Sequence, residues 1–272
     1  MTGNTSTFEK IGPLPVRKPD FGFKKKNTRP ISENDAFLDS LLSALSVFLP
    51  AGERFFINAV KRTKDQFEDP TIQEEIQYFI NQEAQHSKQH LAFNRYLEAC
   101  GFPALESEAQ IDRILERVAK LFPSREDQLI ITVAIEHCTA VLSNMYLQDT
   151  DLQKALDPDV RDLYLWHSQE EIEHKAVAYD IYKALGENYF KRIAFMSATL
   201  LSFAALLIQF QNRFYNAKPT QSRLKRWQQT AKFCLHPRML LMARGFANFY
   251  SPSFHPWQED DLHLIPKATV RA

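Results

Sequence analysis

The chain has 272 residues, is 44% hydrophobic and carries equal numbers of acidic and basic residues, which is compatible with a sizeable folded core. Few glycines, many helix-forming residues and no run with the alternating pattern of a strand exclude an extensive β-sheet and predict an all-α fold. Three widely spaced cysteines, Cys100, Cys138 and Cys234, exclude a disulfide framework and a thiolate zinc site. The first residues lack the apolar core of a secretory signal, so we expect a cytoplasmic protein.

Charge is distributed unevenly along the chain. Residues 1–30 hold seven Lys/Arg and two acids, residues 31–187 hold fourteen Lys/Arg and twenty-eight acids, and residues 188–258 hold ten Lys/Arg and no acid. The acidic middle is the part that we expect to bind cations, and we expect no nucleic-acid partner. The pattern predicts a basic extended arm at 1–31, a metal-binding helical bundle at 32–187, apolar and basic helices at 188–250, and an irregular tail at 251–272.

The arm contains Pro13, Pro15, Pro19 and Pro30 and the lysine run at 24–26. Such a composition is typical of a segment without its own core, and we interpret it as a solvated tail. A phosphate- or lipid-binding arm is the alternative interpretation.

The first long helix is expected from residue 33 to about 48, capped by Ser32. Pro50 and Gly52 are expected to interrupt it, and a second helix is expected from Glu53 to about residue 67. Glu53 would then lie in a first turn, where the helix dipole favours a carboxylate even without a metal.

Two later helices have the same start signal, an aspartate at the N-cap followed by proline at the first helical position. These are Asp69-Pro70, with a helix to about residue 100 ended by Gly101, and Asp157-Pro158, with a helix to about residue 185. A connecting helix is expected at 107–121. A further helix is expected from 125 to about 149, capped by Ser124, and two basic helices at 220–250 are expected to be broken at Pro237.

Four of these helices supply a metal-ligand pattern. Two carry Glu-x-x-His, at Glu83 with His86 and at Glu171 with His174, and each is preceded by a lone glutamate on another helix. In the last of them His167 lies one turn before Glu171 on the same face. The predicted ligands are Glu53, Glu83, His86, Glu136, His167, Glu171 and His174.

Nearby polar residues are interpreted differently. His137 lies about 100° around the helix from Glu136, so we expect it to pack or to support a ligand. Glu170 and Glu173 lie off the ligand face and are interpreted as solvated or supporting carboxylates. His90 has no place in the pattern and is expected not to bind metal.

The ligand order resembles the ferritin-like di-iron carboxylate proteins, a four-helix bundle here with additional C-terminal helices. His167 makes it similar to the p-aminobenzoate N-oxygenase type of di-iron enzyme. That resemblance implies Glu53 and His86 on one metal, Glu136, His167 and His174 on the other, and Glu83 and Glu171 as bridges. Most of the chain resembles the bacterial family of predicted metal-dependent hydrolases, through residues 52–56 (GERFF), 83–86 (EAQH), 167–175 (HSQEEIEHK) and 254–257 (FHPW).

Three functions fit this pattern. The first is O2-dependent oxidation of an unknown organic substrate by two metal ions, iron by preference, with manganese or zinc possible. The alternative is a metal-dependent hydrolase that uses a metal-bound hydroxide. The second alternative is a non-enzymatic, membrane-associated metal-binding protein.

The apolar segment at 193–212 has no formal charge over twenty residues, and basic residues flank it on both sides. Because it is short for a bilayer span and interrupted by polar residues, we expect peripheral contact with the inner face of a membrane. The same helix would give an apolar small-molecule substrate access to the metals. A homodimer through this helix, or burial in the bundle, are the competing interpretations.

Overall fold

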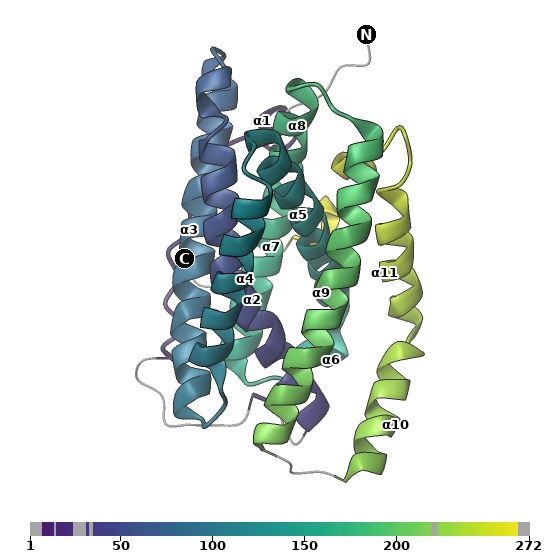
Figure 1. Ribbon diagram of the computed structural model, residues 1–272. Coiled ribbons are helices and arrows are strands. Elements are labelled where there is room, and N and C mark those ends of the chain that lie inside the picture. Colours follow the sequence, from purple (N-terminus) through teal and green to yellow (C-terminus); the bar gives the residue numbers. More distant parts are fainter. Residues whose placement is uncertain (1–6, 14, 24–30, 33–34, 219–221, 266–272) are drawn as a thin grey trace.

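A computed structural model describes residues 7–13, 15–23, 31–32, 35–218 and 222–265 (Figure 1). Over these residues the chain is helical, with one isolated β-bridge between Ser32 and Leu156, and the all-α prediction is confirmed. The α-helices are α1 Thr7–Ile11, α2 Ala36–Lys61, α3 Pro70–Ala99, α4 Ala104–Leu121, α5 Arg125–Gln148, α6 Thr150–Lys154, α7 Pro158–His174, α8 Val177–Ala184, α9 Tyr189–Ala217, α10 Arg223–Cys234 and α11 Pro237–Asn248. Three single-turn 3-10 helices are η2 Lys64–Gln66, η3 Pro256–Gln258 and η4 Leu262–Leu264.

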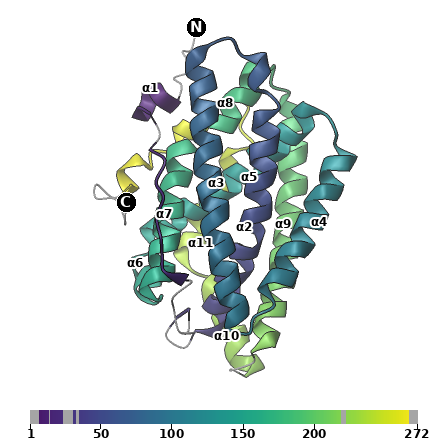
Figure 2. The same cartoon turned by 90° about the vertical axis from the view of Figure 1, so that its left-hand side faces the viewer.

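Four long helices form the central bundle. Helix α2 pairs with α3 and α5 pairs with α7, and the two pairs meet through α2 against α5 and α3 against α7. Outside them, α4 packs on α2 and α3, α9 packs on α2 and α5, and α11 packs on α5 (Figures 1 and 2). The outer helices therefore cover the α2–α5 side of the bundle.

The bundle has two apolar cores with a polar layer between them. One core contains Leu42, Phe93 and Trp166, and the other contains Phe56, Phe79 and Ile130. On α2 and α3 the residues predicted to bind metal lie between the stretches that build the two cores. On α7 they lie between residues of the first core on α7 itself and residues of the second core on α8.

The helix ends follow the predicted signals. Asp69 accepts a hydrogen bond from the amide of Thr71, and Asp157 accepts one from the amide of Asp159, each with proline at the first helical position. Gly101 follows α3 with φ +85°, a left-handed conformation that favours glycine.

Helix α2 differs from the prediction, because it does not stop at Pro50. Asp35 is its N-cap rather than Ser32, and Glu53 lies in the middle of the helix rather than in a first turn. Proline at position 50 leaves the carbonyl of Ser46 without its helical donor. The side-chain amide of Asn94 on α3 donates to that carbonyl at 3.4 Å and so replaces the hydrogen bond that Pro50 cannot make. Tertiary packing here overrides a local helix-breaking signal.

The helix predicted at 158–185 is also wrong in one respect, since it is divided into α7 and α8 by a turn at 175–176. Lys175 is buried at this turn, forms an ion pair with Asp261 and donates to the carbonyl of Glu259 at 3.0 Å. These partners belong to the C-terminal segment, which the helical pattern of this region could not reveal.

The arm is not a solvated tail where the structure describes it. Residues 15–23 run along the bundle beside α3 and α7 (Figure 2), and Phe21 and Phe23 are buried in the core that contains Phe93 and Trp166. The amides of Gln82 and Gln89 donate to the carbonyls of Pro15 and Pro19. The lysine run at 24–26, on which the phosphate- or lipid-binding interpretation depends, lies outside the described residues.

Three helices are long and apolar enough to cross a membrane by length and composition, namely α2 with its extension to residue 66, α5 and α9. The apolar windows of α2 and α5 are 67% buried inside the protein, but that of α9 is only 11% buried. Leu201 and Ile208 on α9, Trp227 on α10 and Leu240 on α11 are exposed. The two helices predicted at 220–250 are present as α10 and α11, divided before Pro237.

Arg192 attaches the beginning of α9 to the chain that follows α11. Its side chain is fully buried, forms an ion pair of 2.6 Å with Glu187, and donates to the carbonyls of Phe249 and Ser251. Its guanidinium also lies 5.0 Å from the ring centre of Phe249.

We therefore expect Arg192→Ala to lower the free energy of unfolding by about 3 kcal/mol, because the buried carbonyls and Glu187 lose their donor. Lys191→Ala is the matched control. Lys191 is the preceding residue and is also paired with an acid, but it is half-exposed, so its loss should cost less than about 1 kcal/mol. Urea unfolding of both variants measures the difference. Equal losses would contradict the role given to Arg192.

Candidate metal centre

The polar layer of the bundle brings the seven predicted ligands together. They come from α2, α3, α5 and α7, and each is at most 5% exposed. The layer is therefore a buried cluster of four carboxylates and three imidazoles. The members are Glu53 from α2, Glu83 and His86 from α3, Glu136 from α5, and His167, Glu171 and His174 from α7.

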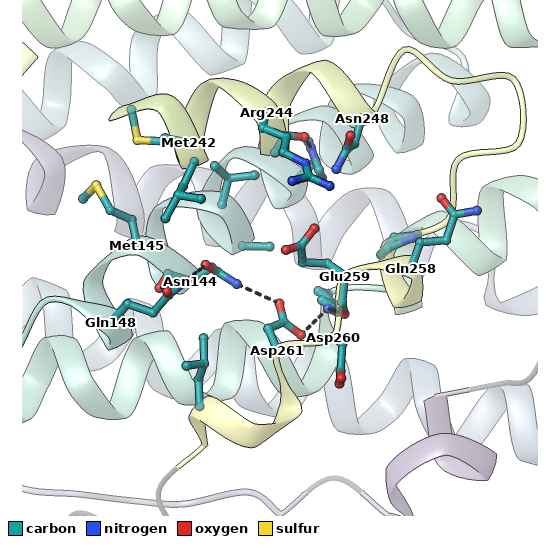
Figure 3. A pocket seen from close by; sticks show the side chains of 18 of the residues that line it. Asn144, Met145, Gln148, Met242, Arg244, Asn248, Gln258, Glu259, Asp260 and Asp261 are labelled. Atoms are coloured by element: carbon teal, nitrogen blue, oxygen red, sulfur yellow. Dashed lines mark hydrogen bonds and ion pairs between the residues drawn. The ribbon is translucent and has the colours of Figure 1, made fainter. Parts of the chain in front are cut away.

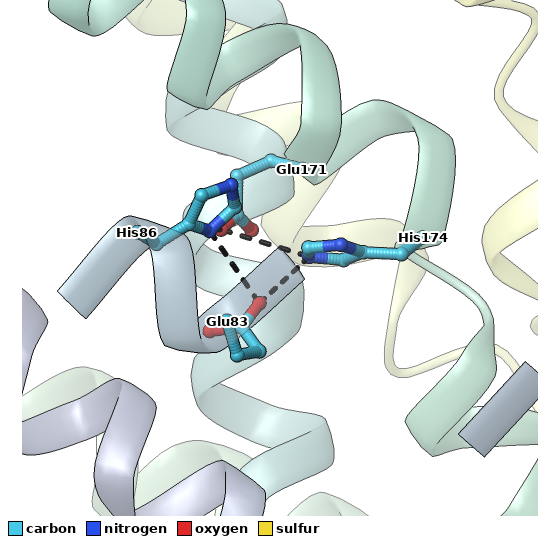
Figure 4. A group of neighbouring side chains, drawn as sticks. All are labelled: Glu83, His86, Glu171 and His174. Carbon is cyan, nitrogen blue, oxygen red and sulfur yellow. Dashed lines mark ion pairs between the residues drawn. The ribbon is translucent and has the colours of Figure 1, made fainter. Parts of the chain in front are cut away.

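Four of them form one tight group (Figure 4). His174 Nε2 lies 3.0 Å from Glu83 Oε1 and 3.7 Å from Glu171 Oε1. His86 Nδ1 lies 3.6 Å from Glu83 Oε1 and 3.5 Å from Glu171 Oε1. Donors bound at about 2.0–2.2 Å to one ion would be separated by roughly 2.8–3.6 Å in octahedral or tetrahedral geometry. The spacing therefore suits a metal ion.

A second group consists of Glu53, His86 and His167, whose ligand atoms also lie within 4.8 Å of one another. His167 Nε2 is 3.4 Å from Glu171 Oε1. The resemblance implied His167 beside His174 on the other metal, whereas the structure places it with Glu53 and His86. Glu136 belongs to neither group, and its Oε2 lies 3.6 Å from His174 Nε2.

Many ligand atoms in the layer have no hydrogen-bond partner. Among the described residues, both carboxylate oxygens of Glu53, Glu83 and Glu136 are buried without a donor, as are Glu171 Oε2, His86 Nδ1 and His174 Nε2. Buried polar atoms without partners are costly, and carboxylates are especially so. Because these atoms lie close together yet do not hydrogen-bond, they are arranged around a shared space that a cation would fill.

The protonation of the layer follows from burial and mutual charge. Burial, and then the charge of neighbouring carboxylates, raises the pKa of Glu53 and of Glu136 well above the usual value. Burial opposes ionisation of Glu171 too, but the neighbouring imidazoles of His174 and His86 outweigh it and hold its pKa well below the usual value. Without metal, protons are therefore shared among these groups.

The two histidines of the tight group, His86 and His174, are stabilised in their protonated forms. Burial favours their neutral forms, but the surrounding carboxylates outweigh it and raise the pKa of His86 and of His174 well above 6.5. A bound metal would take the place of these protons.

Glu170 supports His86 from outside the cluster. His86 Nε2 lies 3.1 Å from Glu170 Oε2, while Glu170 Oε1 accepts from Trp166 Nε1 at 2.9 Å and from Arg17 at 3.0 Å. A carboxylate behind a ligating histidine orients the ring and raises its basicity. Glu170 is fully buried, so its interpretation as a supporting carboxylate fits and the solvated one does not.

Gln82 does the same for His174. Its Oε1 lies 3.1 Å from His174 Nδ1, and its amide donates to Pro15 and approaches Glu173 at 3.4 Å. Glu173 is itself 5% exposed and is held by Arg17 at 2.8 Å. Gln82 and Arg17 were not foreseen. The position of Gln82 directly before Glu83 was an available signal, but nothing local marked Arg17.

His90 lies beside the cluster in a defined tautomer. The hydroxyl of Ser46 donates to Asn94 Oδ1 at 2.7 Å, so at 3.1 Å it accepts from His90 Nδ1, which must carry the proton. His90 Nε2 is then a buried lone pair without a partner, and the ring lies 4.9 Å from that of His167. Burial lowers the pKa of His90 well below 6.5. Its absence from the ligand set stays a prediction.

His137 faces away from the cluster, as expected. Its Nε2 lies 3.0 Å from the carbonyl of Gly245 on α11, and burial lowers its pKa to about 4. It lines a separate cavity of about 300 Å³ between α5, α11 and the C-terminal segment (Figure 3). That cavity contains Asp261, which binds Lys175 and Asn144, and none of the seven clustered residues lines it.

Comparison with known proteins gives one match. The family model of predicted metal-dependent hydrolases matches residues 15–260, a range that contains all seven clustered residues and also Arg17 and Gln82. No curated protein and no solved structure matches the chain. Because the match covers nearly the whole chain, the protein belongs to the family of predicted metal-dependent hydrolases.

Proposed function

We propose that the chain is a hydrolase that holds two metal ions at Glu53, Glu83, His86, Glu136, His167, Glu171 and His174. The observation that carries the proposal is the set of buried ligand atoms that lack hydrogen-bond partners and lie at coordination spacing. Membership of a family of metal-dependent hydrolases supports it. Mixed carboxylate and imidazole ligands suit iron, manganese or zinc.

The bound metals would polarise the substrate and would lower the pKa of a bound water to a value near neutral pH. The residues of this chain contribute orientation and a dry environment. Glu170 and Gln82 keep the rings of His86 and His174 in position, and the two apolar cores exclude bulk water from the layer. His90 Nε2 is an unprotonated nitrogen beside His167 and is placed to accept a hydrogen bond from a water or substrate group near that residue.

Oxidation of an organic substrate with O2 is the second candidate. The observation that favours it is the ligand set itself, with four carboxylates and three imidazoles buried away from solvent. Four carboxylates with two imidazoles, His86 and His174, are typical of ferritin-like di-iron proteins, and His167 is an additional imidazole. The ferritin-like relationship of the bundle remains part of this second proposal.

One experiment separates the two reactions. Protein stripped of metal is reloaded with zinc, manganese or iron(II) without air and tested on carboxylic and phosphoric esters of p-nitrophenol. We expect ester hydrolysis to return with metal, without O2 uptake. Consumption of O2 by the iron(II) form, with a new visible absorption band and no hydrolysis with any metal, would overturn hydrolysis in favour of oxidation.

Ligand substitution tests the metal assignment. We expect His174→Ala and Glu83→Ala to lower the metal content of purified protein by at least about half, because each removes a ligand shared by the tight group. His90→Gln, His137→Gln and Glu74→Ala serve as controls and should retain full metal content. Elemental analysis measures this, and full occupancy in both ligand variants would refute the assignment.

A pH dependence follows from the raised pKa values of His86 and His174. Between about pH 6.5 and 8 the unfolded chain has released these protons while the metal-free folded protein still holds them, so its stability should fall as pH rises. Metal-loaded protein holds metal instead of the protons. We therefore expect the difference in Tm between metal-loaded and chelated protein to widen as pH rises. The widening should be smaller in His174→Gln, which lacks one of the two titrating histidines. A constant difference would contradict the proton exchange.

A further inference from the structure

We infer that the substrate of the metal centre carries a long hydrocarbon chain, which lies in two adjoining apolar cavities between the bundle and its outer helices. The inference rests on the proposed function, because it takes the seven-residue cluster as the reaction site. It assigns a substrate class that neither the family description nor the ligand pattern contains.

The first cavity, here called the inner cavity, adjoins the cluster directly. It has a volume of about 440 Å³, and His167 and Ser168 of α7 form part of its wall. Leucines of α2, including Leu42 and Leu45, line one part of it, and charged side chains that include Asp149, Lys232 and Arg238 line another. A molecule in the inner cavity would therefore contact a proposed metal ligand.

The second cavity, here called the outer cavity, has a volume of about 500 Å³ and lies between α2, α4, α5 and α9. No charged side chain lines it among the described residues, and its polar side chains are hydroxyls. Two of these hydroxyls, of Thr139 and Ser202, donate to carbonyls of their own helices. With its hydroxyls used in this way, the outer cavity offers few polar partners to a ligand and suits hydrocarbon.

The two cavities share a wall. Leu45 and Leu49 of α2 and Thr139 and Leu142 of α5 line both of them. Thr139 lies one turn after Glu136, so this wall is at the level of the cluster. The two cavities therefore adjoin at this level, and together they offer a long, largely apolar space that suits an elongated chain better than a compact polar molecule.

Gly52 keeps the outer cavity open beside the cluster. It lines that cavity and directly precedes Glu53. A Cβ atom at this position would come within 3.4 Å of the ring of Phe56, so a larger side chain would fill the space. The absence of a side chain therefore leaves room for a ligand next to a proposed metal ligand.

The outer cavity also lies against α9, the helix whose apolar residues face outward. Leu201 is 75% exposed and Ile208 is 60% exposed on that helix, while Ala198 and Phe203 line the cavity. No acidic residue occurs between 188 and 258. A hydrocarbon chain could thus enter from free solution or from an anionic bilayer in contact with α9.

Binding of a fluorescent long-chain fatty acid to the whole, metal-loaded protein tests the inference. We expect saturable binding that unlabelled fatty acid displaces, and at least a tenfold weaker affinity in Thr139→Trp, which fills the shared wall. Leu201→Trp is the matched control, because it adds the same ring on the exposed side of α9, and its affinity should equal that of the unaltered protein. Thr139→Val, which replaces the hydroxyl by a methyl group of similar size, should also bind normally.

Thermal melting shows whether Thr139→Trp folds. If it does not, Ala198→Phe narrows the outer cavity from its accessible wall and should weaken binding in its place. The inference would be overturned if the unaltered protein showed no saturable binding. It would also be overturned if Thr139→Trp and Ala198→Phe both bound the probe as tightly as the unaltered protein does. Metal content is measured on the same samples, so that loss of the metal site and loss of chain binding are distinguished.

Flotation with vesicles of anionic phospholipid that carry the same probe identifies the source of the chain. We expect the protein to float with the vesicles at low salt and to acquire the probe. Protein that binds the free probe but stays at the bottom takes its chain from solution, and this outcome supports the cavity assignment while excluding the bilayer as the source.

Discussion

The burial of four carboxylates and three imidazoles in one layer is the constraint on which this fold depends. Such groups are unfavourable in a protein interior unless charge and hydrogen bonds compensate them. The chain surrounds the layer with an apolar core on each side and connects its rim to Glu170, Gln82 and Arg17. Protons relieve part of the repulsion when no metal is present, as the raised pKa values of Glu53 and Glu136 indicate. The carboxylates and imidazoles of the cluster are thus compensated together, at one level of the bundle.

Much of the fold could be predicted from local signals. Asp69 with Pro70 and Asp157 with Pro158 mark helix starts that depend only on backbone chemistry within one turn, and Gly101 marks an end in the same way. The errors have a different origin. The continuation of α2 through Pro50 depends on Asn94 of α3, and the turn after His174 accompanies the ion pair of Lys175 with Asp261. Both involve partners that are far away in the sequence, so no local pattern contains them.

In the candidate metal centre, too, only the features that depend on local geometry could be predicted. The spacing within α3 and α7 is sufficient to align Glu83 with His86 and Glu171 with His174, because helical geometry alone determines which residues share a face. The grouping of His167 with Glu53 and His86 depends on how α7 lies against α2 and α3, which spacing cannot specify. The reaction is harder still to predict, since the same donors suit hydrolysis and oxidation. What lies beside the ligands, such as His90 and the apolar cavities, carries the information on chemistry and substrate.

The contact of Arg17 with Glu170 and Glu173 spans more than 150 residues of sequence. During synthesis Arg17 leaves the ribosome long before α7 exists, and the segment at 15–23 then has no surface on which Phe21 can be buried. This segment can complete its contacts only after the last ligand helix has formed. The segment at 15–23 therefore packs fully onto the bundle at the end of assembly, and until that moment one side of the α3–α7 interface is uncovered. During that period the ligands on α3 and α7 can be approached from this side as well.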